Sequence, residues 1–235
     1  SYMKLITLPA TLLAGMVALY SCTSAPESDK ATTTEAQAVS TDSAGQKWNI
    51  NTNASTIEWV GTKVSGYHTG VVPLKTGDIT VKDGVVTGGR FVMDMANLTV
   101  TGPKGSDTAS NNKLKGHLQS ADFFDVTRHP EGSFELTAVE AYKGGAVKDS
   151  TDVRQEKISK YKVTDPTHTV SGNLTLKGIS KNISVPARIT VTGNSVEAIA
   201  KFNINRKEWN IVYAGKPDDL IRDEIHLGIS VKAEK

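Results

Sequence analysis

The side chains in this sequence that could do chemistry are few and widely spaced. Its five histidines are His68, His117, His129, His168 and His226, and none has a second potential ligand at the spacing of a metal site. The sequence also lacks a Gly-x-Ser-x-Gly elbow, a phosphate-binding loop and a Cys-x-x-Cys pair. We therefore expect no catalytic residues and no bound metal, and we predict that the protein is not an enzyme.

A local acidic cluster lies near the C-terminus. It consists of Asp218, Asp219, Asp223 and Glu224. Carboxylate oxygens are ligands that Ca²⁺ prefers. A calcium site in this cluster is the alternative to the expectation of no metal.

Arg206 ends a row of apolar side chains on a predicted strand. Counting by twos, the row consists of Ala198, Ala200, Phe202 and Ile204, and the opposite face is polar. Because an unpaired buried charge is costly, Arg206 needs either an acidic partner at the rim or a ligand. A guanidinium suits phosphate and also hydrogen-bonds carbonyls, so Arg206 is the candidate residue for a ligand head group. The candidate acidic partners are Asp94, Asp223 and Glu224.

The N-terminal segment has the pattern of an export signal. Lys4 is followed by an uncharged run from Leu5 to Tyr20, which as a helix would span roughly 24 Å, less than the ~30 Å core of a bilayer. The run leads into Ser21 and Cys22, the sole cysteine, in a pattern similar to a bacterial lipobox. Residues 1–21 are therefore predicted to be a lipoprotein signal peptide and Cys22 the lipidated residue. An ordinary signal peptide cut elsewhere is the alternative.

Residues 22–46 have a different composition. They include almost no large apolar side chains and are rich in Ser, Thr, Ala and acidic residues. Such a segment cannot bury enough surface to offset its ordering entropy. We predict that residues 22–46 are the lipidated cysteine and a disordered tether, followed by one folded domain over residues 47–235. A lipid anchor on an exported chain predicts a place in the bacterial cell envelope, facing the periplasm or on the outer-membrane surface.

The folded part alternates between apolar and polar residues with the period of a β-strand. One example is Phe134, Leu136 and Ala138, which alternate with Glu135 and Thr137. Glycine-rich turn signals separate many such stretches, which indicates an all-β sandwich or barrel. Helix is expected only in one or two short pieces, around residues 112–124 and 217–221.

The charges on the strands indicate which face meets water. The polar rows hold Glu58, Lys177 and Lys201, whereas a membrane-spanning barrel would turn apolar side chains outward. We therefore expect apolar side chains to point inward. The formal net charge is only +2 and the sequence contains no long Lys/Arg cluster, which argues against a nucleic-acid partner.

Four blocks of the sequence resemble the YceI-like family. They are "STIEWVGTKVSG" near the start, "HLQSADFFDVTRHPEGSFEL", "VSGNLTLKGISKNISVPARI", and "FNINRKEWNIVYAG" with the last strand "IRDEIHLGISVKAEK". They cover about residues 48–235 in the family's order. The resemblance implies an extended, lipocalin-like antiparallel β-barrel that is exported and binds polyisoprenoids, such as quinones or isoprenyl phosphates, in an apolar tunnel.

Apolar side chains on the inward rows are the candidates for the tunnel wall, and Phe123 and Phe124 for a cap at one end. The candidate wall residues are Trp59, Phe91, Met93, Phe134, Leu174, Leu176, Phe202, Ile204, Ile225 and Leu227. The expected ligand is an isoprenoid or another long-chain lipid. No covalent cofactor is expected apart from the N-terminal lipid, and a membrane is a partner through that anchor. The alternative is a barrel with a packed core that binds a protein partner, using the charged segment 141–160, which could lie at the barrel mouth.

Overall fold

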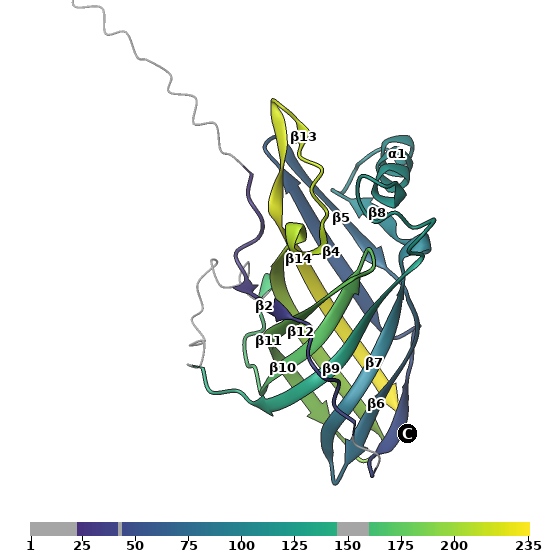
Figure 1. Ribbon diagram of the computed structural model, residues 1–235, viewed down its shortest axis with the longest axis vertical. Coiled ribbons are helices and arrows are strands. Elements are labelled where there is room, and N and C mark those ends of the chain that lie inside the picture. Colours follow the sequence, from purple (N-terminus) through teal and green to yellow (C-terminus); the bar gives the residue numbers. More distant parts are fainter. Residues whose placement is uncertain (1–22, 42–43, 145–159) are drawn as a thin grey trace, which may run out of the picture.

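The alternating stretches form the wall of an antiparallel β-barrel (Figure 1). The computed structural model describes residues 23–41, 44–144 and 160–235. Strands β12, β11, β10, β9, β7, β6, β3 and β14 are paired in this order, and β14 pairs again with β12 to close the ring. The wall strands are β3 (Gln46–Ile50), β4 (Thr56–Lys63), β5 (Gly66–Val72), β6 (Leu74–Lys82), β7 (Val85–Asp94), β8 (Thr99–Gly102), β9 (Glu131–Ala141), β10 (His168–Leu176), β11 (Ile179–Val191), β12 (Ser195–Asn205), β13 (Gly215–Lys216) and β14 (Asp219–Glu234).

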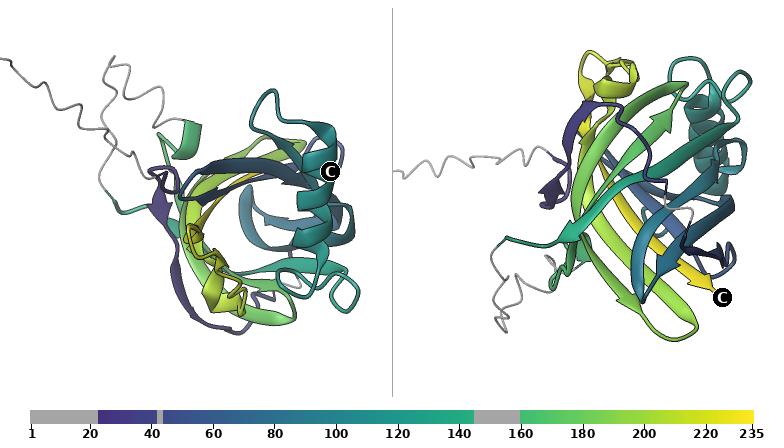
Figure 2. Two further views of the ribbon diagram at one scale, coloured as in Figure 1. Left: turned by 90° about the horizontal axis from the view of Figure 1, so that it is seen from above. Right: turned by 60° about the horizontal axis from the view of Figure 1, so that its bottom comes forward.

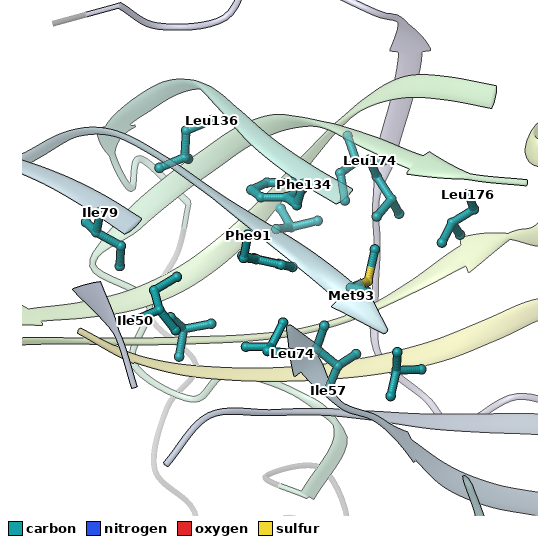
Figure 3. Close-up of a cluster of buried hydrophobic side chains, with 14 of the residues drawn as sticks. Ile50, Ile57, Leu74, Ile79, Phe91, Met93, Phe134, Leu136, Leu174 and Leu176 are labelled. Carbon is teal, nitrogen blue, oxygen red and sulfur yellow. The ribbon is translucent and has the colours of Figure 1, made fainter. Parts of the chain in front are cut away.

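The predicted all-β fold class is confirmed, with its apolar rows inside the barrel. Phe91 and Met93 of β7 and Leu174 of β10 point into the interior (Figure 3). Ile57 and Phe202 are each 1% exposed. The period-two alternation therefore sorts side chains as expected, with apolar groups removed from water and most charged groups outside.

Short helices lie at one end of the barrel. The helix α1 (Thr108–Gln119) begins at Asp107, whose carboxylate accepts hydrogen bonds from the backbone amides of Ala109 and Ser110. It overlaps the helix expected near residues 112–124 but begins earlier. The two 3₁₀-helices are η1 (Met95–Asn97) and η2 (Arg206–Trp209).

The prediction of a helix at residues 217–221 is wrong. β13 and β14 form a hairpin there, in which Gly215 has a φ of 87° and pairs with Leu220. The carboxylate of Asp219 accepts hydrogen bonds from the backbone amide of Ser65 at 2.9 Å and from Lys63 at 2.5 Å. These contacts tie the hairpin to the neighbouring β4–β5 turn, and they favour extended backbone over a helical turn.

The segment predicted as a disordered tether is in part a strap on the barrel wall, which corrects the prediction for residues 22–46. We call residues 23–41 the N-terminal strap. Its strand β1 (Asp29–Lys30) pairs in parallel with β12, and β2 (Thr32–Glu35) pairs antiparallel with β11. Strands β11 and β12 pair with each other only from Ala187 to Val191, so the strap fills the gap where they separate. Figure 2 shows the purple strap against the outside of the green strands.

Asparagine side chains on the outer face of the wall hold the strap. Asn173 accepts a hydrogen bond from the Gln37 amide at 3.0 Å and donates to the Gln37 carbonyl at 2.7 Å. Asn203 donates to the carbonyl of Pro26 at 2.9 Å. Ala31 packs against the core cluster. Asn203 lies on the polar face of its strand, but the strap covers it, and it is only 4% exposed. Hydrogen bonds to backbone groups thus replace apolar burial as the means of ordering this segment.

His226 is a buried histidine next to Asn203, which holds the strap. Its Nδ1 is 2.9 Å from Asn203 Oδ1, and its ring packs edge-on against Tyr161. Burial is the main cause that lowers the pKa of His226 to about 4, with a smaller contribution from Lys201. The folded state therefore favours the neutral ring.

Stability should consequently fall in acid. The pKa of His226 is lower in the folded chain than the ordinary 6.5, so its contribution is complete above pH 6.5 and is lost progressively as the pH falls from 6.5 to 4. Between pH 7.5 and pH 4.5 we expect a loss of about 2–3 kcal/mol from this residue. Urea unfolding at both pH values measures it. The variant His226→Asn should lose correspondingly less, and an equal loss in both chains would contradict the assignment.

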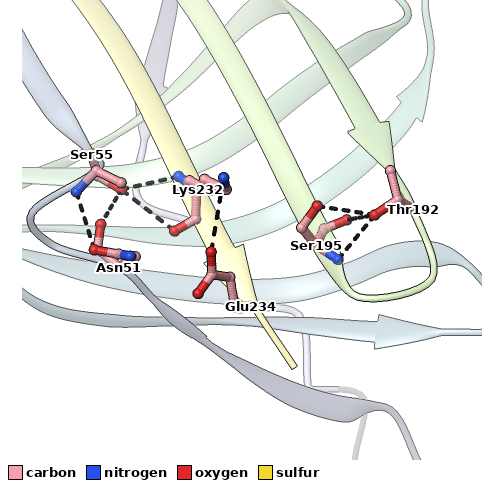
Figure 4. A network of polar contacts seen from close by, with 7 residues as sticks. Asn51, Ser55, Thr192, Ser195, Lys232 and Glu234 are labelled. Atoms are coloured by element: carbon pink, nitrogen blue, oxygen red, sulfur yellow. Dashed lines mark hydrogen bonds and ion pairs between the residues drawn. The ribbon is translucent and has the colours of Figure 1, made fainter.

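The opposite end of the barrel carries the C-terminus and is fixed by polar contacts (Figure 4). The hydroxyl of Ser55 donates to the carbonyl of Asn51 at 2.7 Å and accepts from the amide of Lys232 at 3.0 Å. Ala141 and His168, which flank the charged segment, pair with each other. Most of segment 141–160 lies outside the described residues, but its flanking strands end away from α1.

Candidate functional site

The barrel encloses two apolar cavities, one above the other. The larger has a volume of about 240 Å³ and lies at the α1 end, and the smaller has a volume of about 90 Å³ and lies toward the C-terminus. Among the residues that the structure describes, only Phe91 and Ile229 line both cavities. The interior is therefore neither empty nor fully packed.

Every predicted wall residue lines one of the two cavities. The larger cavity is lined by Trp59, Phe91, Met93, Leu174, Leu176, Ile204, Ile225 and Leu227. The smaller is lined by Phe91, Phe134 and Phe202. Their contact with a lipid stays a prediction. The inward rows could be found from the sequence because their apolar alternation is regular.

Phe91 and Phe134 stack between the cavities. Their ring centroids are 5.4 Å apart, with an angle of 25° between the ring planes. The two residues are paired across β7 and β9, which places both rings on the inward face (Figure 3). Because Phe91 lines both cavities and Phe134 lines the smaller one, the stacked rings lie where the two cavities meet.

The mouth of the larger cavity is covered by α1 and the segment that follows it. Leu114 and Leu118 of α1 line the cavity together with Phe123 and Phe124, which matches their predicted place at one end of the barrel. The ring of His117 packs edge-on against Phe123 and Tyr213, with centroids 4.9 Å and 4.8 Å apart. No residue of α1 is fully buried.

Arg206 is held mainly by backbone carbonyls. Its Nε donates to the Arg222 carbonyl at 3.1 Å, Nη1 donates to Ile211 at 2.5 Å, and Nη2 donates to Ile221 at 3.4 Å. Nη2 also lies 3.5 Å from a carboxylate oxygen of Asp223. Burial lowers the pKa of Arg206, and Asp223 raises it. Most of its N–H donors are thus occupied. Of the two alternatives for Arg206, this favours an acidic partner at the rim, and contact with a head group stays a prediction.

Lys63 and His68 also line the larger cavity, and the sequence analysis did not single them out as wall residues. Lys63 binds Asp219, and together with Ser65 it lowers the pKa of Asp219 to about 2. Burial lowers the pKa of His68 below 6.5, and nearby Lys63 adds to this effect. No sequence signal marks them, because Lys63 meets Asp219 of the distant β13–β14 hairpin and His68 meets Gly102 of β8 only in the folded chain. With Arg206 they make the mouth the polar end of an otherwise apolar cavity.

The described part of the chain contains no group of three or more His, Cys, Asp or Glu side chains placed to hold a metal ion. In the acidic cluster, Asp219 binds Lys63 and Asp223 binds Lys207 at 2.9 Å. Within residues 23–41, 44–144 and 160–235 no helix is long and apolar enough to cross a membrane. Cys22 and the predicted signal peptide lie outside the described residues.

Comparison with known proteins places this geometry in a family. The model of the YceI-like domain matches residues 48–233, which is most of the chain. The chain belongs to the YceI-like domain family. This YceI-like domain is 29% identical over 102 residues to a UPF0312 protein of Pectobacterium carotovorum, a match that covers 43% of this chain and 40% of the relative. A UPF0312 protein of Pseudomonas paraeruginosa is 29% identical over 111 residues, covering 45% and 47%.

Solved structures share the fold of this YceI-like domain. BcnA of Burkholderia cenocepacia is 16% identical with a TM-score of 0.56, and the match covers 78% of this chain and 99% of BcnA. A polyisoprenoid binding domain from Saccharophagus degradans is 10% identical with a TM-score of 0.53, covering 80% and 97%. At these identities the likeness establishes the barrel fold. The sequence matches span less than half the length of the curated relatives.

Proposed function

We propose that the protein binds a long amphiphilic lipid of the polyisoprenoid type in the barrel interior and acts as a carrier or store rather than as an enzyme. The observation that carries the proposal is the larger cavity, whose wall is apolar except near its mouth. The related domain from Saccharophagus degradans is named for polyisoprenoid binding, which supports the same ligand class here. A quinone or an isoprenyl phosphate fits this description.

The energetics favour an apolar tail in the barrel and a polar head at the rim. Burial contributes about 0.8 kcal/mol for each methylene group, so each isoprene unit adds up to about 4 kcal/mol. Part of this is offset by the loss of translational freedom on binding. The tail would lie along Phe91, Met93 and Leu227, and the head group at the mouth beside Lys63 and Arg206, whose positive charges attract a phosphate or carbonyl oxygen.

The proposed location is the bacterial cell envelope. The sequence before Thr23 has the pattern of a lipoprotein signal and ends in Cys22. We therefore include a lipid anchor at Cys22 in the proposal, which would hold the barrel on a membrane surface. A carrier in this place could exchange its ligand with the bilayer.

Native extraction tests the proposed ligand. Residues 23–235, which contain the whole barrel and strap, are exported with a cleavable leader, purified without detergent and extracted with organic solvent for mass spectrometry. We expect an isoprenoid in stoichiometric amount. An empty extract from a folded protein that also takes up no added quinone or isoprenyl phosphate would overturn the proposal and favour a packed, partner-binding barrel.

A further inference from the structure

We propose that the α1 end of the barrel docks on the surface of an anionic lipid bilayer. The docking face consists of α1, the loop 210–214 and the hairpin tips at residues 63–67 and 215–220. It surrounds the mouth of the larger cavity, and Figure 1 shows these elements together at one end of the molecule. The inference concerns the outer surface, so it holds whether or not the barrel carries the proposed ligand.

Exposed apolar side chains gather on this face. Tyr67 is 44% exposed, Val212 56% and Leu220 47%, and they are three of the four large apolar side chains in the described residues that are at least 44% exposed. The amide of Val64 donates to the Leu220 carbonyl at 3.1 Å, which joins the two hairpin tips. Apolar groups concentrated on one end of a protein are typical of a contact with another apolar phase.

The charges of the docking face suit an anionic partner. Four lysines lie on this face: Lys113 and Lys115 on α1, Lys104 in the loop before it, and Lys216 on β13. None of the four forms an ion pair within the described residues. Helix α1 itself contains no acidic residue.

The carboxylates of this face are fewer than its unpaired lysines. Asp219 forms an ion pair with Lys63. Asp107, Asp122 and Asp218 form none with a lysine or arginine in the described part of the chain, and four unpaired lysines stand against these three. Lysines near an anionic bilayer are attracted to it within a Debye length. The balance of free charge on this face is therefore positive.

The N-terminal chain emerges on the same face. The amide of Thr23 donates to the Val64 carbonyl at 3.4 Å, and Arg222 Nε donates to the Thr23 carbonyl at 2.9 Å. Residues 1–22 precede this point. Any membrane attachment in that segment would hold the mouth, rather than the side or the opposite end, against the bilayer.

Vesicle sedimentation tests the docking face without the apolar leader, which would itself bind lipid. The chain of residues 23–235 is mixed with vesicles of phosphatidylcholine alone or with added phosphatidylglycerol. We expect binding to the anionic vesicles that weakens as salt is added. The double variant Lys113→Glu and Lys115→Glu should bind at least tenfold more weakly, and Val212→Asp should also weaken binding.

Matched variants at the other end of the barrel serve as controls. Lys82→Glu with Lys235→Glu makes the same change of charge there, and Val85→Asp replaces a side chain that is 53% exposed. These chains should bind as well as the parent, and all of the variants should keep the parent's circular dichroism. Absence of binding by the parent, or equal loss in the control variants, would overturn the docking face. Neither result would bear on the ligand extracted from the interior.

Discussion

Replacement of Gly61 by leucine is expected to block ligand uptake while leaving the barrel intact. Gly61 lines the larger cavity, and a Cβ at this position would have its nearest neighbours, Trp59 Cζ3 and Ile225 Cδ1, at 3.7 Å and 3.8 Å. Those are ordinary contact distances, so the backbone need not move. The branched side chain would instead occupy part of a cavity of only about 240 Å³.

The expected loss of affinity is at least tenfold, because the side chain takes the space next to the mouth through which a tail must pass. The free energy of unfolding should change by no more than about 1 kcal/mol, since leucine replaces a glycine within a strand. Titration with farnesol and the lipid content of the purified protein measure uptake, and urea unfolding measures stability.

Gly66→Leu is the matched control on the same β4–β5 hairpin. A Cβ on Gly66 meets no atom within 4 Å, so the added side chain points into open space rather than into the cavity. This variant should take up ligand as the parent does. If Gly61→Leu bound ligand with the parent's affinity, the larger cavity would not be the binding site.

Removal of the N-terminal strap is expected to cause the largest loss of stability among these variants. A chain that begins at residue 44 lacks the pairing of β1 and β2 with the wall and the contact of Ala31 with the core. We expect the free energy of unfolding to fall by about 2–4 kcal/mol, because the lost hydrogen bonds and burial exceed the gain in chain entropy. For a domain of this size the melting temperature should fall by about 10 °C.

The exposed seam should also make the shortened chain associate with itself, because β11 and β12 would then present unpaired backbone groups. Calorimetry and size-exclusion chromatography measure the two effects. The comparison chain begins at Thr23 and retains the strap. Equal melting temperatures for the two chains would show that residues 23–41 do not support the wall.

The sequence predicts the interior of this barrel better than its outer contacts. Phe202 and Ile204 could be assigned to the cavity because alternation alone determines which face they share. The main partners of Arg206 are three backbone carbonyls. They could not be predicted, because every residue type carries a backbone carbonyl.

The strap could not be predicted for a related reason. Its residues lack the apolar side chains that mark a packed segment, and Asn173 and Asn203 resemble ordinary surface residues on an outward row. Only the structure shows that the side-chain amides of these asparagines hydrogen-bond the backbone of the strap.

The closure of the wall has a consequence for how the chain folds. The last strand, β14, pairs Ile229 with Ile57 near the start of the domain, and the strap pairs Asp29 with Phe202. Both contacts join residues far apart in sequence, and folds dominated by such contacts form in milliseconds to seconds rather than microseconds. Neither contact can form while the chain is still being synthesised. The interior is therefore separated from water only after the final strand has arrived, which leaves an interval in which open strand edges need protection.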